Sequence, residues 1–394
     1  MYTIAAGAER LDDIVGFHID KIATAAGDDP DILRLENLDT DVPPPTEAIV
    51  ATRAAIGTDE ANSWLPFSGR DDLKQAVVEH IARRGGPRYH TTNIVITCGE
   101  GDAMLDALYC LTSPGDEVLL TDPTYAGMVN RVRLVGARPR FVPLSPVTGR
   151  WRLDVESLRA SITDRTRAVF INNASFPTGW VANRAEWDAV ASVCRERDVW
   201  LLYWAGFEGV LFDGLEVIHP ASLDGMRDRT VTVGAVSLEQ RMIGWRVGWL
   251  VVPKHIADRA ATVHSYNGVV ASGFAQIGAC AALNSLDDGL SGANAEWERR
   301  RDEMLRQLDG LPVISPSGAW SMLLDVAALG VDPMDASARL LEYKVAATPM
   351  VGWGDQLAAR YVRFVFSNEP VERLQVLGER VRGAVRAAGA SGLG

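Results

Sequence analysis

Lysine is scarce in this chain. Of 394 residues, 39 are basic, yet the only lysines are Lys21, Lys74, Lys254 and Lys344. Arginine supplies the rest, so positive charge is present, but primary amines able to form an imine are few. The net charge is −12. An acidic chain lacks the general basic surface that binds nucleic acid, and we expect no nucleic-acid partner.

Other absences narrow the class of protein further. The four cysteines are far apart, without the spacing of a disulfide framework or a CxxC metal site. None of the six histidines has ligand spacing, so no metal is expected. No apolar run reaches about 18 residues, and the N-terminus lacks the basic and apolar regions of a signal peptide. These features favour a cytoplasmic protein with reduced thiols and no membrane contact.

Short apolar runs alternate with amphipathic stretches through most of the chain. Strands are expected at 93–97, 114–120, 168–171, 199–203 and 231–233, with helices between them. This alternation predicts a mostly parallel sheet covered on both faces. From about residue 290 the pattern changes to a charged helix, two short strands and a last helix. We predict an N-terminal arm over 1–45, a large α/β domain over 46–288 and a small α+β domain over 289–394.

Eight short landmarks occur in one order along the chain. None is specific alone, but the set resembles the class I/II aminotransferases of PLP-transferase fold type I. The resemblance implies a seven-stranded, mostly parallel sheet and a homodimer with shared active sites. The landmarks are Gly69 before Leu73, Gly99, 114–117 (Pro-Gly-Asp-Glu), 122–125 (Asp-Pro-Thr-Tyr), 177–179 (Pro-Thr-Gly), 212–214 (Phe-Asp-Gly), 244–246 (Gly-Trp-Arg) and 361–363 (Tyr-Val-Arg).

The resemblance places a lysine where this chain has Leu238. The family segment reads S-x-S-K-x-x-x-M-x-G-W-R-x-G, and here Ser237 and Gly244 keep its spacing. In the family that lysine holds pyridoxal phosphate (PLP) as an imine and shuttles protons. An alkyl side chain has neither nucleophile nor titratable proton.

Other positions that contact PLP in the family also differ. The aspartate facing the pyridine nitrogen matches Trp204, and the groups at the ring hydroxyl match Phe176 and Phe207. Trp64 stands at the tyrosine that reaches the phosphate from the partner subunit, and Ala235 at a phosphate-binding serine. Glu100 replaces a small residue at the phosphate-cradling helix start, and Leu38 a glycine near the substrate carboxylate. We therefore expect no cofactor, and an apolar, aromatic pocket in place of the PLP site.

Two matching positions are retained on the substrate side. Arg363 matches the arginine that pairs with the substrate carboxylate, and its planar fork suits that group. Tyr125 matches the aromatic that stacks on the cofactor ring. A surface arginine and a core tyrosine are the alternatives. Arg246, a phosphate ligand in the family, is predicted to pair with Glu100, although Glu100 could equally complement the helix dipole.

The polar groups expected near the strand ends are the candidates for chemistry. Tyr125, Tyr203, Glu208 and Glu100 are the candidate acids and bases, and Asn173 could orient a substrate carbonyl. A carboxylate beside aromatic walls, such as Glu208, can have a raised pKa, although a solvent-facing glutamate is the alternative.

Three functions are compatible with these residues. The first is a cofactor-independent enzyme that cyclises, isomerises, dehydrates or condenses a small, partly aromatic carboxylate in a biosynthetic pathway. The second is a non-catalytic binding protein. The third is an atypical, lysine-less aminotransferase-like enzyme that uses PLP or pyridoxamine phosphate.

Overall fold

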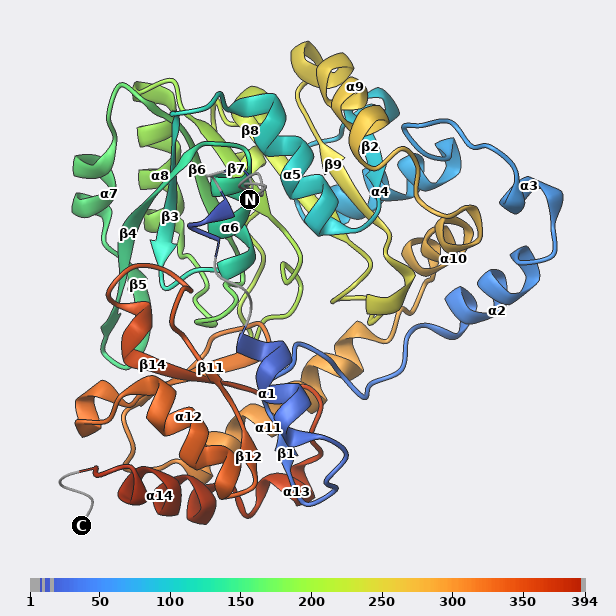
Figure 1. The fold of residues 1–394 in the computed structure, drawn as a ribbon. Coiled ribbons are helices and arrows are strands. Elements are labelled where there is room, and N and C mark those ends of the chain that lie inside the picture. The colour runs from blue at the N-terminus through green and yellow to red at the C-terminus, as the bar shows by residue number, and fades with distance from the viewer. Residues whose placement is uncertain (1–7, 9–10, 15–17, 391–394) are drawn as a thin grey trace, which may run out of the picture.

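The large part of the chain is built on one eight-stranded sheet. In the computed structural model, which describes residues 8, 11–14 and 18–390, the strand order is β2-β9-β8-β7-β6-β3-β4-β5 (Figure 1). Only β5 and β9 run antiparallel to the other six strands of this sheet. The mostly parallel sheet is confirmed. The strands are β2 (Ile94–Thr97), β3 (Glu117–Asp122), β4 (Arg138–Val147), β5 (Arg150–Leu153), β6 (Thr166–Asn172), β7 (Trp200–Trp204), β8 (Thr230–Ala235) and β9 (Gly248–Val251).

The strand count exceeds the predicted seven by one, because β4 and β5 form an edge hairpin. Leu144 pairs with Leu153 and Val147 with Arg150. Three prolines, at 139, 143 and 146, interrupt the alternation of β4. Proline lacks the N–H that a central ladder needs and is tolerated near an edge. The prolines therefore hide the hairpin from a reading of the sequence.

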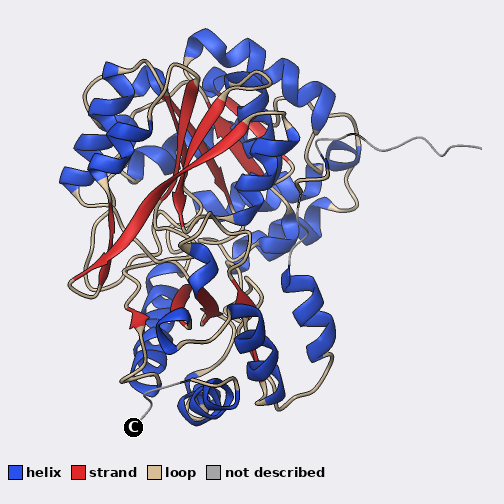
Figure 2. Cartoon of the chain, turned by 60° about the vertical axis from the view of Figure 1, so that its left-hand side comes forward, coloured by secondary structure: helices blue, strands red, loops and turns tan. Residues whose placement is uncertain are grey.

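Helices cover both faces of the large sheet, as Figure 2 shows and the alternating pattern predicted. Asn183 and Glu186 cap the start of α8 reciprocally, each side chain accepting from the other's backbone N–H. The helices of this part are α2 (Thr46–Ala55), α3 (Asp59–Asn62), α4 (Asp71–Arg83), α5 (Glu100–Leu111), α6 (Ala126–Leu134), α7 (Val155–Ser161), α8 (Arg184–Glu196), α9 (Ala257–Asn267) and α10 (Gly273–Asn284).

The small part holds a four-stranded antiparallel sheet of order β10-β11-β14-β13, and a parallel pair, β1-β12. The N-terminal segment belongs here, because Leu33 of β1 pairs with Val345. Domain boundaries at 45/46 and 288/289 stay a prediction. The elements are α1 (His18–Ala26), β1 (Leu33–Arg34), α11 (Leu290–Gln307), β10 (Val313–Ile314), β11 (Ser321–Asp325), α12 (Pro333–Glu342), β12 (Val345–Ala346), β13 (Thr348–Pro349), β14 (Tyr361–Val365), α13 (Val371–Leu374) and α14 (Leu377–Ala387).

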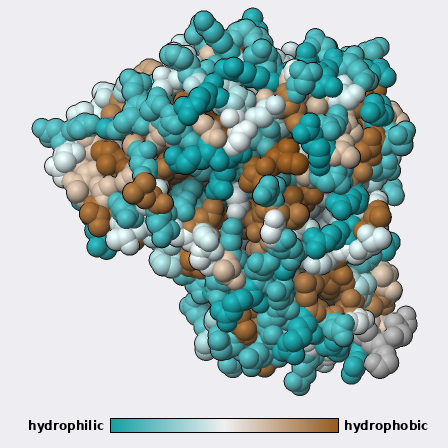
Figure 3. Space-filling view, turned by 180° about the vertical axis from the view of Figure 1, so that it is seen from behind, coloured by the Kyte–Doolittle hydropathy of each residue, from teal (hydrophilic) through white to brown (hydrophobic). Residues whose placement is uncertain are grey.

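One apolar cluster runs from the large sheet into the small one. It contains Phe170 of β6, Trp297 of α11 and Phe364 of β14, all buried. Burial of such side chains contributes roughly 1.5–3 kcal/mol each. On the surface, Figure 3 shows hydrophilic side chains over most of one face, with brown apolar patches between them. No helix of the described residues is long and apolar enough to cross a membrane.

Candidate functional site

The candidate site lies where the carboxyl ends of β3, β6 and β7 face the small domain. Open α/β sheets bind ligands at this edge. Tyr125 follows β3, Phe176 follows β6, and Trp204 is the last residue of β7. The segment from Phe207 continues directly beyond Trp204. Four aromatic residues thus approach one place from three adjacent strands.

These aromatic side chains pack against one another. The ring of Tyr125 lies 5.2 Å from that of Trp204 and 6.3 Å from that of Phe176, centroid to centroid. Phe207 lies 6.1 Å from Phe176 and 6.2 Å from Trp204. Such offset and tilted pairs are favourable beyond their burial. Phe176, Phe207 and Trp204 are all buried, so three of the residues predicted to line an aromatic pocket pack against one another.

Arg363, from β14 of the small domain, is fully buried beside this cluster. Its guanidinium carbon lies 4.7 Å from the ring centre of Phe176 and 4.5 Å from that of Trp353. One nitrogen, Nη2, donates to the carbonyl oxygen of Glu36 and to Thr348 Oγ1. Nε and Nη1 have no hydrogen-bond partner in the part of the chain that the structure describes. Burial lowers the pKa of Arg363 to about 9, so it is still charged at neutral pH.

Trp353 completes this arrangement and was missed from the sequence, because it stands in an irregular loop without a motif. Its ring lies 5.6 Å from Phe176 and 6.2 Å from Tyr125. The loop is fixed to the large domain at Asp122, whose carboxylate accepts from the backbone of Leu357 and Ala358 at 3.0 Å each. Gly354 permits this approach, because a Cβ there would overlap the Asp122 carboxylate.

Glu100 lies at the start of α5 and contacts the aromatic cluster. Its Oε2 accepts a hydrogen bond of 3.1 Å from the indole Nε1 of Trp204. Gly206 leaves space for this pair, since an added Cβ would overlap the indole. Burial raises the pKa of Glu100, while the Trp204 bond and the charge of Arg246 oppose the rise.

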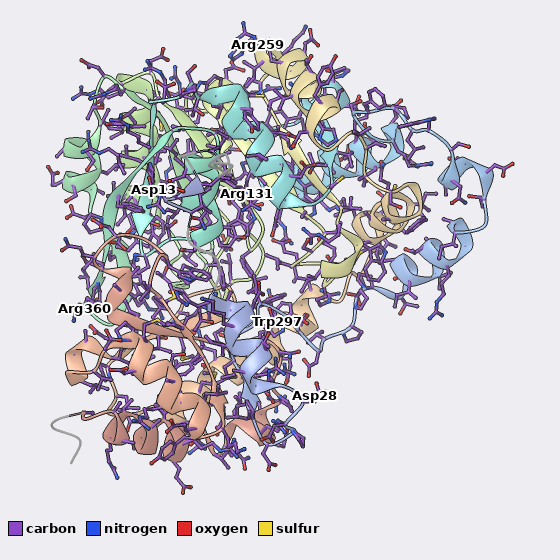
Figure 4. All side chains as sticks on the ribbon, viewed as in Figure 1. Asp13, Asp28, Arg131, Arg259, Trp297 and Arg360 are labelled. Atoms are coloured by element: carbon purple, nitrogen blue, oxygen red, sulfur yellow. The ribbon has the colours of Figure 1, made fainter. Side chains whose placement is uncertain are left out.

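The predicted ion pair between Glu100 and Arg246 is wrong. Arg246 is exposed, and its Nη1 donates to the carbonyl oxygen of Ile243 at 2.9 Å. Among the described residues Arg246 and Glu100 make no direct ion-pair contact, although the charge of Arg246 is near enough to oppose the rise in the pKa of Glu100. The guanidinium of Arg246 packs against the backbone of Gly99. A Cβ at that position would overlap the guanidinium, so the glycine leaves space for it. Arg131, labelled in Figure 4, approaches the same helix start from α6 and donates to the carbonyl oxygen of Gly101.

The remaining predicted ligand-binding residues are dispersed. Leu238 is buried in the core just after β8, and Leu38 packs against the same core. Asn173 is buried, and its Oδ1 accepts from the backbone N–H of Ala182 at 2.7 Å. Trp64 is 80% exposed and contacts Phe67, away from the cluster.

Tyr203 and Glu208 are not part of the aromatic cluster. Successive strand residues point to opposite faces of a sheet, so Tyr203 points away from the side of Trp204. Its ring lies 5.7 Å from Trp187 of α8 and 5.4 Å from His219. Its hydroxyl donates to Glu208 Oε1 at 2.8 Å. The structure therefore separates these two candidates from Arg363.

Glu208 belongs to a buried network of charged groups. Burial, and then the nearby charge of Glu239, raise its pKa to about 8. Glu239 in turn binds Arg84 Nη2 at 2.6 Å and accepts from the backbone N–H of Gly209. His219 Nε2 lies 4.0 Å from Glu208, and burial lowers the pKa of His219 to about 4, so it is neutral. The raised pKa expected for Glu208 is found, but on the other face.

A third polar cluster joins α5 to α9. His264 Nδ1 lies 2.9 Å from Asp106 Oδ2 and 3.6 Å from Asp102 Oδ2. Asn267 Nδ2 donates to both carboxylates, at 2.7 and 3.0 Å. These three acidic and imidazole groups lie close enough to share a cation. Their mutual bonds already account for the arrangement as a link between two helices.

Fold and site together define a protein built like the PLP-transferases of fold type I. The sequence profile described as aminotransferase class I and II matches residues 31–381, so the chain belongs to this family. An arginine–pyruvate transaminase of Pseudomonas aeruginosa is 32% identical over 315 residues, 79% of each chain. A probable N-acetyl-LL-diaminopimelate aminotransferase of Bacillus subtilis is 28% identical over 391 residues, 97% of this chain and 95% of the relative.

Solved structures show the same fold. N-succinyldiaminopimelate aminotransferase from Mycobacterium tuberculosis superimposes with a TM-score of 0.90 at 27% identity, covering 97% of this chain and 100% of that one. Aspartate aminotransferase from Thermus thermophilus, in a structure with maleate, gives a TM-score of 0.88 at 26% identity, over 97% and 100% of the chains. The predicted α/β fold is thereby confirmed.

Proposed function

We propose that this family member binds a small, partly aromatic carboxylate at Arg363 and acts on it without PLP. The carrying observation is the Arg363 guanidinium. It is fully buried, and two of its N–H-bearing nitrogens lack a partner among the described residues. Leaving such donors unpaired is costly, and a carboxylate fits the planar fork bidentately. The Thermus relative, solved with maleate, gives an example of a carboxylate held on this fold.

The surroundings of Arg363 favour a flat or apolar substituent beside the carboxylate. Phe176 and Trp353 flank the guanidinium, and Tyr125 packs against both rings. Aromatic rings supply large contact area and favour offset stacking. A substrate with an aromatic or planar group next to its carboxylate would match these walls.

Several residues speak against PLP at this site. Lys21, Lys254 and Lys344 are exposed, and Lys74 binds Asp71 on α4, so none of the four lysines, all of which the structure describes, is placed as an amine buried beside Tyr125. The ring that packs on Tyr125 is the indole of Trp204, where the resemblance places the cofactor ring.

The place of the cofactor phosphate is equally changed. Glu100 puts a carboxylate at the helix start that would hold that phosphate, where like charges repel. Glu100 and the Trp204 indole together leave a site that does not fit the cofactor.

Acid–base chemistry without a cofactor is what the remaining groups support. Tyr125 and Glu100 are the candidates on this face, and the raised pKa of Glu100 suits a proton donor. Positioning by Arg363 could assist cyclisation, isomerisation, dehydration or condensation. Glu208 and Tyr203 are not proposed as catalytic, because they lie on the opposite face.

The family itself supports a second candidate. Two relatives that are 32% and 28% identical to this chain are named as a transaminase and a probable aminotransferase. Their names favour an atypical, lysine-less enzyme that uses PLP or pyridoxamine phosphate. A non-catalytic binding protein would need only the Arg363 site. Spectroscopy and ligand binding separate the three.

The first test is the absorption spectrum of the purified protein titrated with PLP. We expect no aldimine band in the wild type or in Leu238→Lys, because Trp204 and Glu100 still fill the site. A stable band in Leu238→Lys would overturn this account of the pocket. Saturable PLP binding by the wild type would favour the second candidate.

The second test uses hydrocinnamate as a carboxylate probe. Arg363→Leu should weaken its binding by about 2–5 kcal/mol, the range for truncating one partner of a buried charge pair. Arg360→Leu is the matched control on the same segment, because Arg360 is half exposed and already paired with Asp325 at 2.7 Å. Equal binding by both variants would contradict the proposal.

A homodimer is part of this proposal. Trp64 is 80% exposed beside Phe67, which is 48% exposed. Such an apolar pair on a loop suits burial against a second copy, where Trp64 would reach the partner's site. Sedimentation of the wild type against Trp64→Ser measures whether association depends on this pair.

A further inference from the structure

A cavity of about 560 Å³ lies behind the Glu239 network, apart from the aromatic cluster. It is lined by the end of α4, by the loops after β7 and β8, and by the connection from α10 to the first turns of α11. Its volume exceeds that of any amino-acid side chain. The residues that matter for its chemistry are Arg83, Arg84, Gln240, Asp288 and Asn294.

Three buried polar atoms of this lining lack hydrogen bonds. Gln240 is 1% exposed, and neither its Nε2 nor its Oε1 has a partner within the described ranges. Asn294 uses its Nδ2 on the carbonyl oxygen of Gly209 at 2.8 Å, while its Oδ1 is unpaired there too. Buried polar groups are almost always bonded, so such a group calls for a ligand or water. The unpaired set comprises two acceptors and one donor group.

The charges around the cavity have both signs. Arg83 and Arg84 contribute positive charge from the end of α4, and Asp288 contributes a carboxylate from the connection to α11. Arg84 is partly neutralised by Glu239 at 2.6 Å. Burial lowers the pKa of His80 to about 3, so its imidazole adds no charge.

We propose that this cavity binds a free α-amino acid as its zwitterion. The ammonium group supplies donors for Gln240 Oε1 and Asn294 Oδ1, and the carboxylate accepts from Gln240 Nε2 and faces Arg84. A simple anion would leave both acceptor oxygens unpaired. A simple cation would lie near two arginines. A ligand carrying both groups on one small frame supplies donors for the two acceptor oxygens and an acceptor for the Gln240 amide, and its opposite charges match the arginines and Asp288.

This site is independent of the proposed carboxylate site. Gln240 follows Leu238 by two residues, but it faces the cavity with Arg84 and Asn294, whereas Arg363 lies with Phe176 and Trp353. A ligand here could therefore bind whether or not the aromatic cluster is catalytic.

The test is calorimetric titration of the full-length protein with the proteinogenic L-amino acids, one at a time. We expect saturable binding of at least one, weakened about tenfold or more in Gln240→Leu, since both amide bonds are lost. The N-acetyl derivative and the carboxamide derivative of the amino acid that binds should each bind more weakly by a similar factor. Ser285→Ala is the matched control, because Ser285 Oγ is already bound to the Asp287 carbonyl oxygen at 3.0 Å.

Two outcomes would overturn the inference. If no amino acid binds the wild type, the unpaired atoms are hydrated and the cavity holds water only. If binding survives Gln240→Leu but is lost in Arg363→Leu, the amino acid occupies the aromatic site, and the cavity proposal fails while the carboxylate proposal stands. Should Gln240→Leu not fold, Gln240→Met removes the same polar atoms with an unbranched side chain and serves the same purpose.

Discussion

Tyr203 and Trp204 are neighbours in β7, yet they belong to two different environments. On the Tyr203 side, the hydroxyl binds Glu208, and Glu239 binds Arg84, so the titratable groups are largely paired. On the Trp204 side, aromatic rings flank Arg363, whose Nε and Nη1 have no hydrogen-bond partner among the described residues. Buried charges that are paired with one another need no further partner. A buried cation that leaves hydrogen-bond donors without a partner is costly and therefore indicates a ligand. The candidate site for chemistry is therefore the Trp204 face, where Arg363 lies.

Removal of the Trp204 indole should cause the largest loss of stability. Trp204→Ala should lower the free energy of unfolding by about 3–5 kcal/mol, because it deletes a buried indole that contacts Tyr125, Phe207 and Glu100. Denaturant unfolding measures this. Trp200→Ala is the control in the same strand, since Trp200 is only half-buried and stacks on His255. Equal losses in the two variants would mean that the Trp204 face is no better packed than the strand's end.

The Tyr203 face can be tested through Glu208. Its pKa is raised to about 8, so the folded state binds a proton more tightly than the unfolded state. Stability from this group is therefore present below the ordinary pKa of about 4.5 and is lost as the pH rises towards 8. Glu208→Gln keeps an acceptor for Tyr203 but removes the charge. We expect it to be near neutral in acid and more stable than wild type at alkaline pH, by on the order of 5 kcal/mol, because the pKa rises from 4.5 to about 8 and each pKa unit corresponds to about 1.4 kcal/mol.

Thermal unfolding across this pH range measures the difference between the two proteins. Glu196→Gln serves as the control for replacing an exposed glutamate by glutamine. A constant offset for Glu208→Gln, independent of pH, would show that the carboxyl group is already ionised in the folded protein.

The sequence could predict the layers of the fold, because apolar runs and the order of landmarks record burial directly. It also identified Arg363 and three aromatic replacements that lie in one cluster, Phe176, Trp204 and Phe207, whereas a fourth, Trp64, lies apart from them. It could not identify Trp353, since a loop residue acquires its position from contacts such as those of Asp122 with the 357–358 backbone. Nor could it show the Gln240 cavity, which four separate segments create.

One error could have been avoided from sequence alone. Tyr203 and Trp204 were assigned to the same pocket, although the two-residue period of a strand sends them to opposite faces. The Glu100–Arg246 pair was a different kind of error. Opposite charges near one helix start suggested it, but Trp204 supplies the hydrogen bond to Glu100 at 3.1 Å, and the Arg246 guanidinium packs on Gly99 and donates to the carbonyl oxygen of Ile243.

The smallest expected effect concerns the contact between Glu100 and Trp204. Glu100→Gln keeps an acceptor for the indole and removes a charge whose pKa burial raises, so stability should change by no more than about 1 kcal/mol, in favour of the variant as the pH rises. Glu117→Gln is a control in which the change in stability should have the opposite sign. Burial alone would raise the pKa of Glu117, but Thr163 and Arg140 lower it overall, so that variant loses favourable bonds and should be destabilised at neutral pH. Thermal unfolding of both variants decides. A large loss in Glu100→Gln would mean that the negative charge itself holds the start of α5, with Arg246 and Arg131 as its counter-ions, and that the Trp204 face contains a second buried ionic group to set beside Arg363.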